Sequence, residues 1–190
     1  MNKLTLLRAD LITNRSVGTD QQVLELNDSI NKKLNTSDQK FNNDNCYRIT
    51  SFQLPDWLKE AIDKLLREIV ELYQEDLVFN KVNLKNYDIH SWVNVNLPGS
   101  RNTMHSHIKA HFSCVYYIQG TETGNLRLIN PANVLGNCNP SAPWMRDISY
   151  SPKDRDLIIW PAWMPHEVET NFSDKNRINI TSDIIFKTNE

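Results

Sequence analysis

Residues 105–119 read HSHIKAHFSCVYYIQ and join a histidine-rich segment to an apolar strand pattern. Side chains alternate between the two faces of an extended strand, so we expect His105 and His107 to point the same way. The apolar run over 112–119 predicts a strand directly after them. A third histidine on another strand would complete a three-sided metal site that leaves coordination positions open for chemistry.

A second segment supplies that third histidine. Residues 157–161, LIIWP, are typical of a buried strand, and His166 follows five residues later. A single histidine is more often a surface or hydrogen-bonded core residue than a ligand. Three of the five histidines nevertheless fall within residues 105–111, which favours a metal site. Non-haem Fe(II) oxygenases bind iron through two histidines and a carboxylate, written H-x-D…H, and here His107 stands at the Asp position.

Length and charge set the broad class. The 190 residues suit one domain, with residues 1–87 as N-terminal strands and supporting helices and 88–190 as the core that carries the metal site. A net charge of −2 gives no electrostatic case for nucleic-acid binding. No apolar run approaches a membrane span, and no feature indicates an oligomer.

The N-terminal residues and the cysteines indicate a protein that is not exported. Charged residues interrupt residues 1–10 before any apolar signal region develops. Cys46, Cys114 and Cys138 are odd in number and widely spaced, which suits reduced thiols rather than a disulfide framework. Cys114 lies in an apolar strand and is interpreted as core packing. We therefore expect a cytoplasmic protein.

The elements expected along the chain are mainly strands. Apolar spacing predicts helices over 20–34 and from 55 to 73, the second with a broad apolar stripe that packs on a sheet. Residues 35–46 are interpreted as a connection and 131–143 as a long loop near the mouth of the fold. Strands are predicted over 3–12, 47–54, 88–97, 112–119, 124–130, 146–151, 156–161, 166–170 and 176–187. The pattern predicts a mainly β protein with flanking helices, folded as a sandwich or barrel.

The last predicted strand has one polar and one apolar face. Arg177, Asn179, Thr181 and Asp183 share the first, and the isoleucines at 178, 180 and 184 share the second. In a two-layered β fold the polar face would line a pocket while helices cover the isoleucines.

Residues 94–118 (NVNLPGSRNTMHSHIKAHFSCVYYI), 156–168 (DLIIWPAWMPHEV) and 177–181 (RINIT) together resemble a small family of 2-oxoglutarate/Fe(II) oxygenases found in phages and marine bacteria. The resemblance covers about the C-terminal half. That family is similar to prolyl hydroxylases and implies a double-stranded β-helix, a jelly roll with a cupin-like barrel. It commonly has H-x-H in place of H-x-D. The chain departs from it at Arg155, where the family tends to have Gly in a turn.

The resemblance implies a role for each motif residue. His105, His107 and His166 would be the catalytic Fe(II) ligands, and Arg177 would bind the distal carboxylate of 2-oxoglutarate, for which a planar guanidinium fork is suited. Tyr117 would bind the same carboxylate, and Asn179 is a further candidate cofactor contact. The plain alternatives are an exposed salt bridge for Arg177 and core packing for Tyr117.

The implied reaction couples oxidative decarboxylation of 2-oxoglutarate by dioxygen to oxidation of a substrate, with hydroxylation the default outcome. Replacing a carboxylate by His107 leaves the metal centre one unit more positive. The sequence does not name the primary substrate: a protein side chain, a free amino acid, a sugar and a nucleobase all remain open. A phage-encoded protein would act in the host cytoplasm.

Two other interpretations use nearly the same residues. Gly99-x5-His105-x-His107-x3-His111 resembles the first cupin motif, with His111 in place of its Glu, and Pro161-x-Trp163-x2-His166 resembles the second. A cupin would be a metal-dependent enzyme or binding protein without 2-oxoglutarate, and would not need a carboxylate clamp such as Arg177. The third possibility is a non-catalytic jelly-roll protein.

Overall fold

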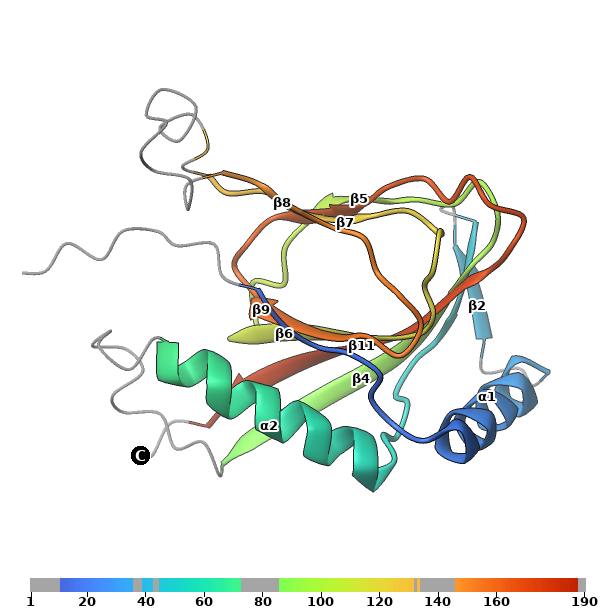
Figure 1. Cartoon of the computed structure of the whole chain (residues 1–190), viewed down its shortest axis with the longest axis horizontal. Coiled ribbons are helices and arrows are strands. Elements are labelled where there is room, and N and C mark those ends of the chain that lie inside the picture. Colours follow the sequence, from blue (N-terminus) through green and yellow to red (C-terminus); the bar gives the residue numbers. More distant parts are fainter. Residues whose placement is uncertain are drawn as a thin grey trace, which may run out of the picture.

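The computed structural model describes residues 11–35, 39–42, 45–72, 86–131, 133 and 146–187. Two antiparallel β-sheets face each other, and two helices cover the outer side of the larger sheet (Figure 1). No helix in these ranges is long and apolar enough to cross a membrane.

The larger sheet has seven strands in the order β1-β9-β6-β11-β4-β3-β2. Its centre is made of β4 (Tyr87–Asn96), β6 (Phe112–Gln119), β9 (Leu157–Pro161) and β11 (Arg177–Phe186). One edge is β1 (Ile12–Asn14), and the other side ends with β3 (Cys46–Ile49) followed by the edge strand β2 (Gln39–Asn42). Strand β11, which like β4 has ten residues, lies between β4 and β6 and pairs with both along most of its length.

The smaller sheet has four short strands in the order β5-β10-β7-β8. They are β5 (Asn102–His105), β10 (His166–Val168), β7 (Leu126–Leu128) and β8 (Ile148–Tyr150). The two sheets do not join edge to edge into a closed barrel in the described part of the chain. The jelly-roll architecture is therefore confirmed as two facing sheets.

Both helices form where the apolar spacing predicts them. Helix α1 (Asp20–Leu34) starts with a capping box, in which Thr19 and Gln22 each accept a hydrogen bond from the other's backbone N–H. Helix α2 (Asp56–Leu72) follows Pro55 and buries Leu58, Ile62, Leu65, Leu66 and Ile69. These side chains pack in one core with Ile180 and Ile184 of β11, so the isoleucine face of that strand meets the helices as expected.

A second, smaller core lies between the sheets and contains Val115, Tyr117, Leu126, Leu128, Ile158, Trp160 and Met164. It leaves room for polar side chains on the inner face of β11. Cys114, on the opposite face of β6, packs in the helix-side core as predicted.

Some predicted elements lie outside the described residues, and others differ from those observed. Most of the predicted strand over 3–12, most of residues 131–143 and Cys138 lie outside the described residues, and β3 begins one residue earlier and is shorter than predicted. Residues 35–46 were interpreted as a connection, but they contain β2, which pairs with β3. Pairing with a partner strand stabilises such a polar segment, and its own sequence gives no apolar alternation to detect.

Arg155 replaces the family's glycine in a left-handed turn before β9, with φ of 70°. Few residues other than glycine adopt this conformation. Its guanidinium donates hydrogen bonds to the carbonyl of Gly18 and to Asp20 Oδ1, so it ties this turn to the start of α1. These contacts offset the backbone strain and leave the histidines untouched.

Candidate metal centre

The fold brings His105, His107 and His166 together, and one possible ligand atom of each lies within 4.8 Å of the others. His105 ends β5 and His166 begins β10, and the two residues are paired across the smaller sheet. Their ring centroids are 4.3 Å apart, and those of His107 and His166 are 5.1 Å apart. The predicted ligand set therefore forms one group.

The prediction that His107 lies on the same strand as His105 is wrong. Strand β5 ends at His105, so His107 lies in the loop that leads to β6. The backbone N–H of His107 donates to the carbonyl of Ala162 (3.0 Å), which ties this loop to the segment before His166. This inter-loop contact, rather than the alternation of a strand, directs His107 towards the other two rings.

All three rings have their Nδ1 atom next to an oxygen acceptor. The distances are 2.7 Å from His105 to the Thr103 carbonyl, 2.5 Å from His107 to Asp183 Oδ1 and 3.1 Å from His166 to the Met164 carbonyl. An acceptor at this position selects the tautomer with the proton on Nδ1, so the Nε2 lone pair is free. Metal-binding histidines are typically held by such a second contact.

Burial favours the neutral form of two of the three imidazoles, those of His166 and His105. It is the largest cause that lowers the pKa of His166 to about 4, and the neighbouring His105 and His107 lower it further. Partial burial also lowers the pKa of His105. A metal ion binds neutral imidazole, so these side chains are ready to bind one at neutral pH.

The cavity beside the histidines has one polar and one apolar wall. Asn179 and Thr181 of β11 line the polar wall, as the strand pattern predicts, and Asn94 of β4 lies beside them. The apolar wall consists of Val115, Leu126, Trp160 and Val168. Such walls exclude water from a reaction site.

Arg177 is buried with only 1% of its surface exposed, so its interpretation as an exposed salt bridge is wrong. Its Nη1 donates to the carbonyls of Thr123 (2.7 Å) and Glu169 (3.3 Å). Its Nε and Nη2 are buried without a hydrogen-bond partner, and no carboxylate of the described chain forms an ion pair with it. A buried cation with unpaired donors is costly, and a ligand carboxylate would satisfy it.

Tyr117 and Asn179 both line the cavity beside the histidines. Burial raises the pKa of the Tyr117 hydroxyl, and the nearby Arg177 partly opposes this shift. The Oδ1 of Asn179 accepts from Asn94 Nδ2 (3.0 Å) and from Thr181 Oγ1 (3.2 Å), so the amide group is held in one orientation. Tyr117 also belongs to the core between the sheets, so packing and ligand binding are compatible roles.

His111 is not part of the three-histidine group. Its Nδ1 accepts a hydrogen bond from the backbone N–H of Phe186 (3.2 Å), and its ring packs against the Phe186 ring. The cupin arrangement, which needs a ligand at this position, therefore has no support from the geometry.

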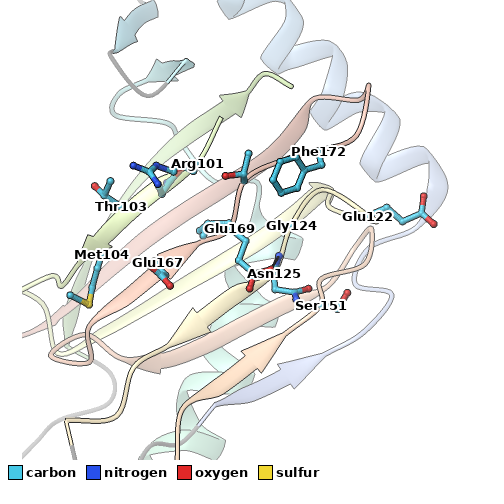
Figure 2. Close-up of a pocket in the computed structure, with 13 residues that line it drawn as sticks. Arg101, Thr103, Met104, Glu122, Gly124, Asn125, Ser151, Glu167, Glu169 and Phe172 are labelled. Carbon is cyan, nitrogen blue, oxygen red and sulfur yellow. Dashed lines mark hydrogen bonds between the residues drawn. The ribbon is translucent and has the colours of Figure 1, made fainter. Parts of the chain in front are cut away.

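A larger hollow of about 620 Å³ lies elsewhere on the smaller sheet. Figure 2 shows Thr103, Met104, Glu167 and Glu169 along it, with Phe172 at one end. None of the three histidines lines it. It is separate from the metal centre, although Asn102 and Val168 contribute to both cavities.

Sequence reasoning did not single out three residues of the site. Asp183 contacts His107. Trp92 stacks on the His107 ring with a centroid distance of 5.8 Å, and Arg48 in turn lies 4.7 Å over the Trp92 ring. The polar face of the last strand included Asp183, but its partner could not be found without the fold.

Comparison with known proteins agrees with the geometry. A family model described as "putative 2OG-Fe(II) oxygenase" matches residues 90–183, which span β4 to β11 and include all three histidines. No curated protein sequence gives a match.

Solved structures establish the fold. The chain is similar to a Pseudomonas putida prolyl-4-hydroxylase, with 12% identity, a TM-score of 0.61 and coverage of 95% of this chain and 94% of that one. It is also similar to a Trichoplax adhaerens prolyl hydroxylase in complex with a peptide fragment of hypoxia inducible factor (12%, TM-score 0.63, 92% and 83%). A third similar structure is HygX from Streptomyces hygroscopicus with nickel and 2-oxoglutarate bound (11%, TM-score 0.59, 93% and 83%).

The facing sheets and the histidine group thus define a double-stranded β-helix protein with a candidate metal centre. The family match identifies it further: the chain belongs to the 2-oxoglutarate/Fe(II)-dependent oxygenases.

Proposed function

We propose that this oxygenase binds Fe(II) through His105, His107 and His166 and hydroxylates a substrate. The carrying observation is the arrangement of the three rings: each has its Nδ1 next to an oxygen acceptor, and one possible ligand atom of each lies within 4.8 Å of the others. Imidazole nitrogen is a suitable ligand for iron, and three ligands leave positions open for cosubstrate and dioxygen.

Buried donors without a partner support 2-oxoglutarate as cosubstrate. Arg177 Nε and Nη2 and Trp160 Nε1 are buried donors without a partner in the described structure. We infer that Arg177 binds the distal carboxylate, with Tyr117 and Asn179 beside it. Holding that end fixes where the opposite end of the cosubstrate lies, which is how binding contributes to rate.

Bound Fe(II) and 2-oxoglutarate supply the oxidising chemistry, in which dioxygen converts the cosubstrate to succinate and carbon dioxide while the substrate is oxidised. The chain supplies geometry and a dry environment. Trp92 limits the motion of the His107 ring by stacking on it, and the wall formed by Val115, Leu126, Trp160 and Val168 keeps bulk water away.

We expect the primary substrate to approach past Arg48 and Trp92. Both residues line the metal cavity and also a neighbouring hollow formed with residues 50–53 and 89–91. The two cavities therefore meet at this pair. A cytoplasmic location, the host cytoplasm for a phage-encoded protein, is part of the same proposal, and the buried thiol of Cys114, which forms no disulfide, suits it.

The proposal is tested by a crystal soaked with Fe(II) and 2-oxoglutarate without oxygen. We expect electron density for one ion between the three histidines and for the cosubstrate, with one carboxylate at Arg177. Calorimetric titration of Mn(II), followed by 2-oxoglutarate, gives the same information in solution. Metal binding without 2-oxoglutarate binding would favour a cupin-like function, and no metal binding would favour a non-catalytic jelly-roll protein.

A further inference from the structure

The carboxylate of Asp183 forms a direct hydrogen bond with His107, one of the proposed metal ligands. Its Oδ1 lies 2.5 Å from His107 Nδ1, and the pair is mostly buried, with side-chain exposures of 22% and 10%. Ser113 Oγ donates to the same Oδ1 (3.0 Å). The carboxylate is thus fixed on one side by β6 and faces the imidazole on the other.

This contact bears on the substitution of His107 for the usual aspartate. A metal centre with three neutral histidines carries one positive charge more than a centre with two histidines and a carboxylate. Asp183 supplies one negative charge to this centre, and the His107 ring separates the carboxylate from the proposed metal position. The contact also sets the His107 tautomer that leaves Nε2 free.

We propose that Asp183 is a positioning residue that replaces the missing ligand carboxylate by acting through His107. This inference rests on the proposed metal site. Asp183 orients the ring, raises its strength as a ligand and lowers the net charge of the centre. The other two histidines lack this support, because their Nδ1 atoms face backbone carbonyls.

The surroundings of the pair favour this role over a purely structural ion pair. His107 is confined by Trp92 on its ring face and by its backbone bond to Ala162, so its fold position does not depend on Asp183 alone. Asp183 is also on the face of β11 that carries Asn179 and Thr181, both of which line the metal cavity.

The test compares the Mn(II) affinity of the wild type with that of five variants. Asp183→Asn keeps an oxygen that accepts from His107 and Ser113 but removes the charge, and we expect Mn(II) affinity to fall about 10- to 100-fold. The matched control is Glu167→Gln, which removes a carboxylate adjacent to His166 in sequence. Glu167 pairs with Arg127 and points into the separate hollow of Figure 2, so this variant should keep wild-type affinity.

The double variant His107→Asp/Asp183→Asn distinguishes charge replacement from general disruption. It moves the carboxylate back to position 107, so we expect it to bind Mn(II) more tightly than Asp183→Asn alone. A merely structural role for Asp183 predicts instead that the double variant shows the sum of the losses measured in Asp183→Asn and in the single variant His107→Asp. Asp183→Glu should recover part of the affinity lost in Asp183→Asn, and Co(II) absorption spectra should change in Asp183→Asn and not in Glu167→Gln.

The outcomes separate this inference from the proposed function. Wild-type protein that binds no Mn(II) would overturn both. Tight binding by wild type and equal binding by Asp183→Asn would overturn the role of Asp183 alone and leave the three-histidine site intact. An additive loss in the double variant would also overturn it.

Discussion

The side chain with the most specific expected effect is Arg177, because its replacement by alanine should weaken 2-oxoglutarate binding without weakening metal binding. Arg177 has two buried nitrogens without a partner in the described structure, and each can donate to a carboxylate. A hydrogen bond to a charged group contributes about 1.5 kcal/mol or more. Two such bonds amount to about 3 kcal/mol, which corresponds to about a 10²-fold loss of affinity.

The assay is calorimetric titration of 2-oxoglutarate into Mn(II)-loaded protein, which avoids turnover. Arg177→Lys should recover only part of the affinity, since an ammonium group lacks the planar fork of donors. Arg101→Ala is the matched control, because it removes an arginine from the separate hollow on the smaller sheet. Its 2-oxoglutarate affinity should equal that of the wild type.

Arg177 also has a structural role that the experiment must separate. Its Nη1 holds the carbonyls of Thr123 and Glu169, so Arg177→Ala should lower the free energy of unfolding by about 1–3 kcal/mol. The Mn(II) affinity of each variant shows whether the metal site survives. Equal 2-oxoglutarate affinity in wild type and a folded, metal-binding Arg177→Ala would refute the assigned role.

Other predictions concern the remaining site residues. Replacing any one of the proposed ligands His105, His107 and His166 by alanine should abolish tight Mn(II) binding in a calorimetric titration. Wild-type affinity in all three variants would refute the metal site. His111→Ala should keep Mn(II) affinity nearly unchanged, because Nδ1 of His111 is bonded to the Phe186 backbone; a strong loss would favour a cupin arrangement. Tyr117→Phe should weaken 2-oxoglutarate about 5- to 10-fold if its hydroxyl donates to the carboxylate, whereas unchanged affinity would make it a core residue. For the metal-free protein, burial lowers the pKa of His166 from 6.5 to about 4. The unfolded chain therefore binds a proton that the folded chain excludes, so stability should fall as pH decreases through this window, by up to about 1.4 kcal/mol per pH unit. Urea denaturation at several pH values measures this slope, which should be smaller in His166→Gln.

The predictions that held depend on local patterns. Helix α1 was predicted over its full length because its apolar residues repeat at helical spacing, and the structure adds a capping box of Thr19 and Gln22 at its start. Strand β6 (Phe112–Gln119) was also predicted with its observed bounds. In both segments a few neighbouring residues determine the structure, so the sequence is informative without the fold.

The predictions that failed depend on long-range pairing. Strand β2 forms because Gln39–Asn42 pairs with β3, and no apolar alternation marks it. His107 meets the other histidines through a backbone bond to Ala162, a residue 55 positions later. The contact between His107 and Asp183 spans 76 residues. Such contacts arise from the register between strands and loops, which a single sequence does not specify.

Strand β11 explains why one substitution at position 107 need not remove the function of the site. Arg177, Asn179, Thr181 and Asp183 occupy alternate positions on its inner face, with the cation at one end and the carboxylate at the other. The regular rise of a strand places these ends about 20 Å apart. The carboxylate end meets the histidines through His107, and the cation end has unpaired donors for an anion. A single strand thus fixes the polarity of the site, so the proposed metal end and the proposed cosubstrate end remain defined although position 107 carries an imidazole.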